Sequence, residues 1–109
     1  MSFDRIQQLL AFKQEEPNDP FLWYSLALEY QKTDLALAEE HFVHLLKNHP
    51  DYVATYYHLA KLWVKMEKID DAKAVYEKGM EVAQKVHDQH IFKELKSAYD
   101  IFLFEEYDD

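Results

Sequence analysis

Residues 23–30 read WYSLALEY, and residues 56–63, which lie 33 positions further along the chain, read YYHLAKLW. An aromatic residue, a leucine, an alanine and a second aromatic residue stand at the same spacings in both stretches. The matching pairs are Trp23/Tyr56, Leu26/Leu59, Ala27/Ala60 and Tyr30/Trp63. Downstream the match continues with a shift of one residue, which a shortened turn between two helices would leave. The chain therefore contains an internal repeat, and a period of this length is typical of helical repeat proteins.

The period and the residues together resemble the tetratricopeptide repeat, a helix–turn–helix unit of 34 residues with the pattern W-x-x-L-G-x-x-Y, A-x-x-x-F, P. The first unit carries Trp23, Leu26, Ala27, Tyr30, Ala38, Phe42 and Pro50, and the second carries Tyr56, Leu59, Ala60, Trp63, Ala72 and Tyr76, with Gln84 in place of the proline. The resemblance implies an all-α fold: a short right-handed α-solenoid of antiparallel helix pairs. We expect five helices in total, of which the last is a C-terminal capping helix.

The register of the repeat predicts one domain over residues 1–109. Its expected parts are an N-terminal half-repeat helix (1–16), repeat 1 (17–50), repeat 2 (51–84), and a capping helix with an acidic tail (85–109). The helical segments are expected at 3–15, 20–32, 35–48, 52–66, 69–86 and 89–104. Asp19, Asp34 and Asp88 are the expected N-caps, and the acidic end, residues 105–109, is expected to fray. The aromatic residues of the repeat pattern, Tyr76 among them, are expected in the core with no binding role.

Composition narrows the function. The chain has 21 acidic and 12 basic residues and a net charge of −9, which disfavours nucleic acid and anionic membranes as partners. It has no cysteine, so no disulfide or thiolate site is available. Neither a secretory signal nor an uninterrupted apolar stretch of membrane-spanning length is visible, and we expect a cytoplasmic location.

Enzymatic chemistry is not expected. A chain with one glycine cannot build a glycine-rich phosphate loop, and its serines lack a nucleophile elbow. We expect no cofactor and no metal site. His41 with His44, and His87 with His90, are spaced to share a helix side, but a stable zinc site needs three or four ligands. These histidines are therefore expected to lie on a solvent-facing helix surface.

The informative surface is the concave groove that the leading helices line in proteins of this family. Carried over by the register, the expected groove residues are Phe21, Tyr24, Leu28, Gln31 and Lys32 from the first leading helix, and Ala54, Tyr57, His58, Lys61, Val64 and Lys65 from the second. Apolar side chains beside lysines suit a peptide that carries carboxylates next to aromatic or aliphatic groups. The family's carboxylate clamp is not indicated, because Tyr24, Leu28 and His58 stand at its positions.

Three functions remain open at this stage. The first is a non-enzymatic protein–protein interaction module, or adaptor, that binds a partner's peptide segment in its groove. The second is a self-assembling solenoid that forms a homo-oligomer, for which the aromatic and acidic residues 102–109 could enter a neighbouring molecule's groove. The third and most remote is a histidine-based metal carrier.

Overall fold

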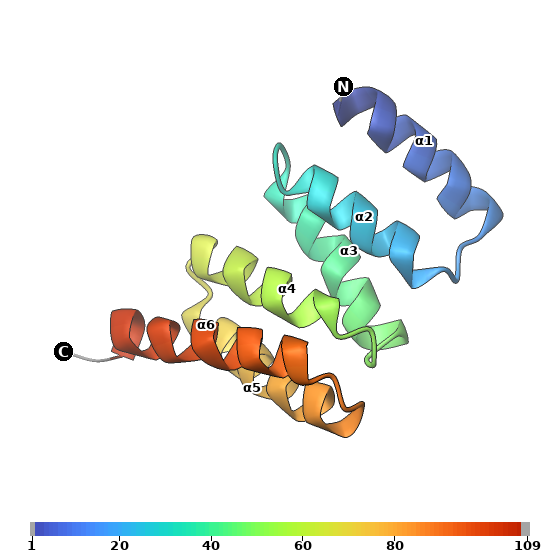
Figure 1. Cartoon of the computed structure of the whole chain (residues 1–109). Coiled ribbons are helices and arrows are strands. Elements are labelled where there is room, and N and C mark those ends of the chain that lie inside the picture. The colour runs from blue at the N-terminus through green and yellow to red at the C-terminus, as the bar shows by residue number, and fades with distance from the viewer. Residues whose placement is uncertain (1, 108–109) are drawn as a thin grey trace. The chain divides into compact units, whose positions relative to one another are not determined.

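The computed structural model describes residues 2–107, and these form six α-helices and no strand (Figure 1). The helices are α1 (Ser2–Glu15), α2 (Pro20–Tyr30), α3 (Leu35–Asn48), α4 (Ala54–Lys65), α5 (Ile69–Lys85) and α6 (Gln89–Tyr107). The all-α class is confirmed, but the expected total of five helices is wrong by one. Two helix pairs and a cap make five, and the N-terminal half-repeat helix, which was itself expected, is the sixth. The right-handed sense of the solenoid and the single-domain organisation stay predictions.

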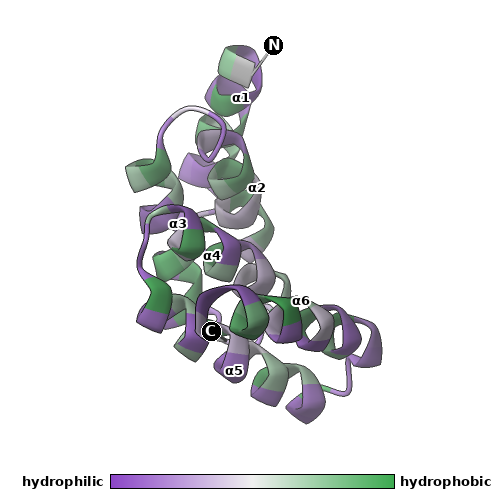
Figure 2. Cartoon of the chain, turned by 90° about the vertical axis from the view of Figure 1, so that its left-hand side faces the viewer, coloured by the Kyte–Doolittle hydropathy of each residue, from purple (hydrophilic) through white to green (hydrophobic). Residues whose placement is uncertain are grey.

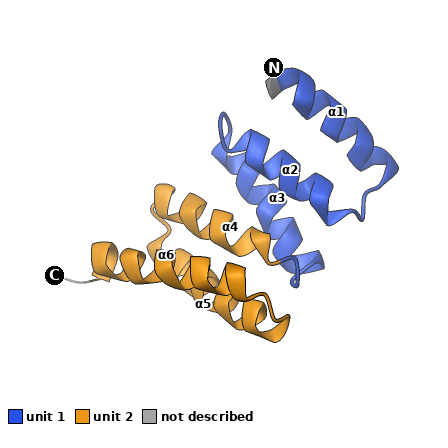
Figure 3. Cartoon of the chain, viewed as in Figure 1, with its two compact units in different colours: residues 1–52 blue, residues 53–109 orange. Residues whose placement is uncertain are grey.

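The chain divides into two compact units, residues 1–52 and residues 53–109 (Figure 3). In the first unit, α2 packs against α3 and α1 packs against α2. Leu9 of α1 is buried with Leu22 and Leu26 of α2, and Ile6, Leu10 and Tyr30 surround them. Helices α1 and α3 carry both apolar and polar residues (Figure 2), so that each has one side to bury, whereas α2 is apolar on nearly every side.

In the second unit, α5 packs against both α4 and α6. Gly79 of α5 lies at a close approach of α4, because a Cβ atom built on it would stand 2.5 Å from the Cβ of Tyr56. Leu95 and Phe102 hold α6 to this core and are buried. Gly79 therefore serves the packing of α5 against α4.

The small and aromatic residues of the repeat pattern occupy the core largely as expected. Alanines 27, 38, 60 and 72 are fully buried, as a close crossing of helices requires. Phe42, Tyr56 and Tyr76 are buried as well. Trp23, Tyr30 and Trp63 are only half-buried, and the Trp23 indole Nε1 donates a hydrogen bond of 2.8 Å to the backbone oxygen of Pro17.

The helix ends follow the capping residues of the sequence. Asp19, Asp34 and Asp88 accept hydrogen bonds from the backbone N–H groups of Phe21, Leu37 and Ile91, respectively. At the other end of α6, the expectation that residues 105–109 fray is wrong for residues 105–107, which continue the helix. The Tyr107 hydroxyl donates a hydrogen bond of 2.7 Å to Asp70 at the start of α5, which holds this last turn in place. Residues 108 and 109 lie outside the described residues.

Within the described residues, none of the helices combines the length and the apolar character that crossing a membrane requires.

Candidate functional site

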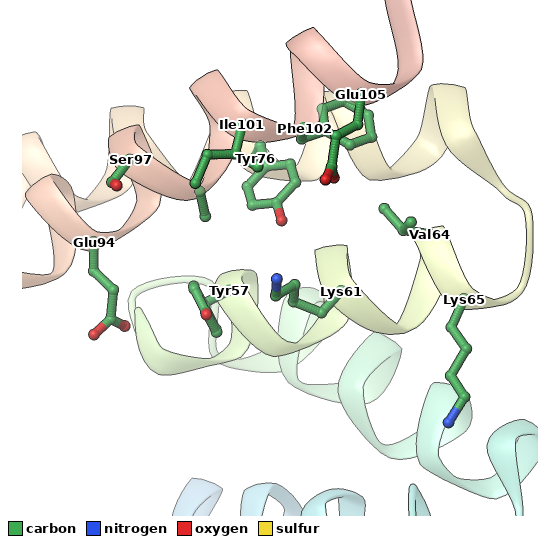
Figure 4. A pocket seen from close by; sticks show the side chains of 11 residues that line it. Tyr57, Lys61, Val64, Lys65, Tyr76, Glu94, Ser97, Ile101, Phe102 and Glu105 are labelled. Atoms are coloured by element: carbon green, nitrogen blue, oxygen red, sulfur yellow. The ribbon is translucent and has the colours of Figure 1, made fainter.

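The second unit contains a groove of about 590 Å³ between α4 and α6, with α5 beneath it (Figure 4). One wall consists of α4 residues, the other of α6 residues, and the floor includes Tyr76 of α5. The lining residues are Tyr57, Lys61, Val64, Lys65, Tyr76, Glu94, Ser97, Ala98, Ile101, Phe102 and Glu105. All of them belong to the unit of residues 53–109.

Helical spacing explains why α4 presents these side chains. Tyr57, Lys61 and Val64 recur at intervals of four and three residues, which places them on one side of the helix. The residues between them, Leu59 and Ala60, are fully buried in the core. The same repeat pattern that fills the core with small and apolar residues thus leaves a second stripe of α4 free to line a groove.

The α6 wall follows the same rule. Glu94, Ala98, Ile101 and Glu105 recur every three or four residues on one side of α6, whereas Leu95 faces the core. Reading this helix only as a cap missed its second role as a wall of the groove. The signal was present in the sequence as a stripe of apolar and acidic residues offset by one position from the buried residues.

Tyr76 lies in the core, as expected, and it also lines the groove. Its side chain is 1% exposed, and its ring packs against Phe102 with centroids 5.2 Å apart. Its hydroxyl, however, points into the groove on the side of Lys61 (Figure 4). Burial of the ring, with lesser contributions from Tyr57 and Glu105, raises the pKa of Tyr76 to about 12, so the hydroxyl keeps its proton at neutral pH.

Charges of opposite sign stand on the two walls. Lys61 and Lys65 belong to α4, and Glu94 and Glu105 belong to α6. Within residues 2–107, neither lysine has a carboxylate oxygen within 4 Å of its ammonium group. The Lys61 ammonium lies 5.7 Å from the centre of the Tyr57 ring.

The groove residues expected from α4 divide into two groups. Tyr57, Lys61, Val64 and Lys65 line the groove, whereas Ala54 and His58 do not. His58 is half-buried, and burial lowers the pKa of its imidazole while Glu94 opposes that effect.

The groove residues expected from the first leading helix lie in the other unit. Phe21 is 53% exposed, and Tyr24, Leu28 and Gln31 are half-buried. The Tyr24 ring contacts the Tyr52 ring, with centroids 5.6 Å apart. Lys32 pairs with Glu29 at 3.3 Å. A binding role for these five residues stays a prediction.

His41 corrects the expectation of surface histidines. It is 3% exposed, and its Nδ1–H donates a hydrogen bond of 2.9 Å to the Leu37 backbone oxygen. Its Nε2 accepts a hydrogen bond of 3.2 Å from the Lys13 ammonium of α1, which also lies 4.1 Å from the centre of the Trp23 ring. Burial lowers the pKa of His41. His44 stacks on Trp23, with ring centroids 3.4 Å apart, so both side chains serve packing.

His87 and His90, the other expected surface pair, are exposed. Among residues 2–107, no three histidine or carboxylate side chains come together as a group that could hold a metal ion.

Comparisons with known proteins agree with the helical repeat and with the all-α fold. The family model described as Tetratricopeptide repeat matches residues 29–98. A solution NMR structure of a tetratricopeptide repeat domain protein from Salinibacter ruber is 40% identical, with a TM-score of 0.79 over 84% of this chain and 93% of that one. A crystal structure of a tetratricopeptide repeat domain protein from the same organism is 39% identical, with a TM-score of 0.77 over 81% of this chain and all of the other. The comparison with curated proteins gives no match.

The chain therefore belongs to the tetratricopeptide repeat family. Domains of this family generally act as scaffolds for protein–protein interaction rather than as enzymes.

Proposed function

We propose that this protein is a non-enzymatic interaction module that binds a peptide segment of a partner protein in the groove between α4 and α6. The observation that carries the proposal is the composition of that groove. Tyr57, Val64 and Ile101 give it an apolar surface, and Lys61 points an ammonium group into it that lacks a carboxylate partner in the described structure, whereas the Lys65 side chain extends away from the groove (Figure 4). An exposed apolar surface beside an unpaired charge is expected of a peptide-binding site, whereas a purely structural helix face would not need it.

The size of the groove supports the same proposal. A volume of about 590 Å³ holds several side chains of a bound segment. Ile101 is 57% exposed there, and a peptide would cover it. The groove lies within one compact unit, so its two walls are fixed by their shared packing on α5.

Selection from a random library of twelve-residue peptides displayed on phage tests the proposal. Wild-type protein should enrich a family of related peptides. Ile101→Glu should lose them, because it puts a charge in the apolar part of the groove, while Lys85→Glu on the exposed surface of α5 should keep them. Failure of the wild-type protein to enrich any peptide family, or equal binding by the Ile101 variant, would refute the proposed function.

Self-association is the second candidate, and exposed phenylalanines favour it. Phe3 of α1 and Phe104 of α6 are each 70% exposed, which costs solubility unless a partner covers them. Sedimentation of the wild-type protein and of Phe104→Ser, at high concentration, tests this candidate. A wild-type protein that remains a monomer removes it.

A further inference from the structure

The Tyr76 hydroxyl is a polar group in an unusual position. The rest of its side chain is buried between α5 and α6, against Phe102 and Tyr99. Within residues 2–107, the hydroxyl has no hydrogen-bond partner. It nevertheless points into the groove (Figure 4). The buried ring holds this hydroxyl rigidly, and its O–H is free to donate a hydrogen bond to an acceptor on a bound ligand.

Two other tyrosines of this unit, both on α6, use their hydroxyls as hydrogen-bond donors. Tyr99 donates to Glu77, and Tyr107 donates to Asp70. In both cases a tyrosine of α6 uses a carboxylate of α5 as acceptor. Tyr76 has the same kind of donor, but within residues 2–107 it makes no such hydrogen bond, although Glu105 is near enough to contribute to its raised pKa.

Lys61 lies on the same side of the groove as the Tyr76 hydroxyl, and both side chains point into one part of it (Figure 4). The hydroxyl comes from α5 and the ammonium from α4, so one acceptor placed between them would receive hydrogen bonds from two helices. A carboxylate meets this need, because it has two acceptor oxygens and a negative charge for the lysine.

We propose that the Tyr76 hydroxyl and the Lys61 ammonium together form an anchor for an aspartate or glutamate side chain of a partner peptide, with apolar residues of the same peptide against Val64 and Ile101. This inference rests on the proposed function and names the chemistry of its ligand. Tyr76 is therefore a specificity residue as well as a core residue.

The charges of the opposite wall complete the recognition pattern. Glu94 and Glu105 lie on α6, across the groove from Lys61 of α4. A segment with an acidic residue toward α4 and a basic residue toward α6 matches both walls. A small free anion complements only the α4 wall, because the carboxylates of the α6 wall repel it. The charges thus favour a peptide segment over a free anion such as phosphate.

The test uses the most strongly enriched peptide of the phage selection, synthesised with acetylated and amidated ends, and its counterpart in which the acidic residue is replaced by the matching amide. Calorimetric titration measures both peptides against wild type, Tyr76→Phe and Lys61→Met. Tyr99→Phe is the matched control, since it removes a hydroxyl from the same unit that already has a partner. The blocked ends leave the side chain as the only source of a carboxylate.

We expect wild type to prefer the acidic peptide by about tenfold, the lower end of what a hydrogen bond to a charged group contributes. Tyr76→Phe should weaken the acidic peptide about tenfold and reduce the preference for acid over amide. Lys61→Met, which changes an exposed side chain and spares the fold, should do the same. Tyr99→Phe should leave both affinities unchanged.

Three results overturn the inference while the proposed function stands: enriched peptides without an acidic residue, an unchanged preference in both Tyr76→Phe and Lys61→Met, or binding that requires a free C-terminus. A selection that enriches no peptide refutes the proposed function itself.

Discussion

Replacing Gly79 with alanine probes a close contact between α4 and α5 in the second unit. In an open helix this substitution stabilises by about 1 kcal/mol, because alanine has the higher helix propensity. Here the new Cβ would lie 2.5 Å from the Cβ and 3.0 Å from the Cγ of Tyr56, and 3.1 Å from the Cδ1 of Leu95. The Cβ of Tyr56 is fixed to the α4 backbone, so α4 and α5 have to move apart. Overpacking of this kind costs about 1–3 kcal/mol.

The balance of the two effects gives the expected result. Overpacking offsets or exceeds the gain in propensity, so Gly79→Ala should lower the free energy of unfolding by up to about 2 kcal/mol. Urea denaturation followed by circular dichroism measures it. Ala74→Gly, at an exposed position of the same helix, is the control and should cost about 1 kcal/mol from propensity alone. If Gly79→Ala instead stabilises the protein by about 1 kcal/mol, the close contact between α4 and α5 is wrong.

Three further predictions concern stability. His41 has a lowered pKa in the folded state, so the folded protein binds fewer protons than the unfolded one, and stability should fall as the pH drops below the unfolded value of about 6.5. Urea midpoints at pH 7.5 and 5.5 should show this loss, and His41→Gln should show less of it; an equal loss would assign it to other groups. Ala60→Leu should lower the free energy of unfolding by about 1–3 kcal/mol, because Ala60 is fully buried at a helix crossing. Lys73→Ala should lower it by less than about 1 kcal/mol, because it breaks only an exposed ion pair. Equal urea midpoints for the two variants would show that the register is wrong. Tyr107→Phe removes the hydrogen bond to Asp70 and should speed amide hydrogen exchange in the last turn of α6, and unchanged exchange would mean that this bond does not hold the turn.

The helices and their core could be predicted from the sequence because the same pattern of core residues occurs in both repeats. Ala27 and Ala60 stand at one crossing of the repeat, and Ala38 and Ala72 at another, and all four are buried. The capping residues Asp19 and Asp34 were equally predictable, because an N-cap acts on a backbone N–H only two or three residues away. Local chemistry was sufficient in each case.

The environment of His41 could not be predicted from spacing, because it depends on a residue far away in the sequence. Lys13 belongs to α1 and reaches His41 across 28 residues of chain. The i, i+3 spacing of His41 and His44 says only that they share a side of α3, and not what covers that side. The last turn of α6 poses the same difficulty, since Tyr107 is held by Asp70.

The groove was half predictable. Tyr57, Lys61, Val64 and Lys65 follow from the register, which places them one helix side away from the core. The opposite wall was not recognised, because α6 lacks the aromatic and alanine pattern that marks the other repeats. The register correctly places the ring of Tyr76 in the core, but it does not tell where the hydroxyl at the end of the ring lies. In the structure this hydroxyl points into the groove (Figure 4).

Mapping the bound peptide by NMR tests the central claim most directly. The most strongly enriched peptide is titrated into ¹⁵N-labelled protein, and the amide shifts are followed residue by residue. The account predicts that the largest changes fall on residues 57–65 of α4 and 94–105 of α6, and that α1 changes little. Largest changes on α1 or α3, or changes spread evenly over the chain, would contradict the claim that the groove between α4 and α6 is the binding site.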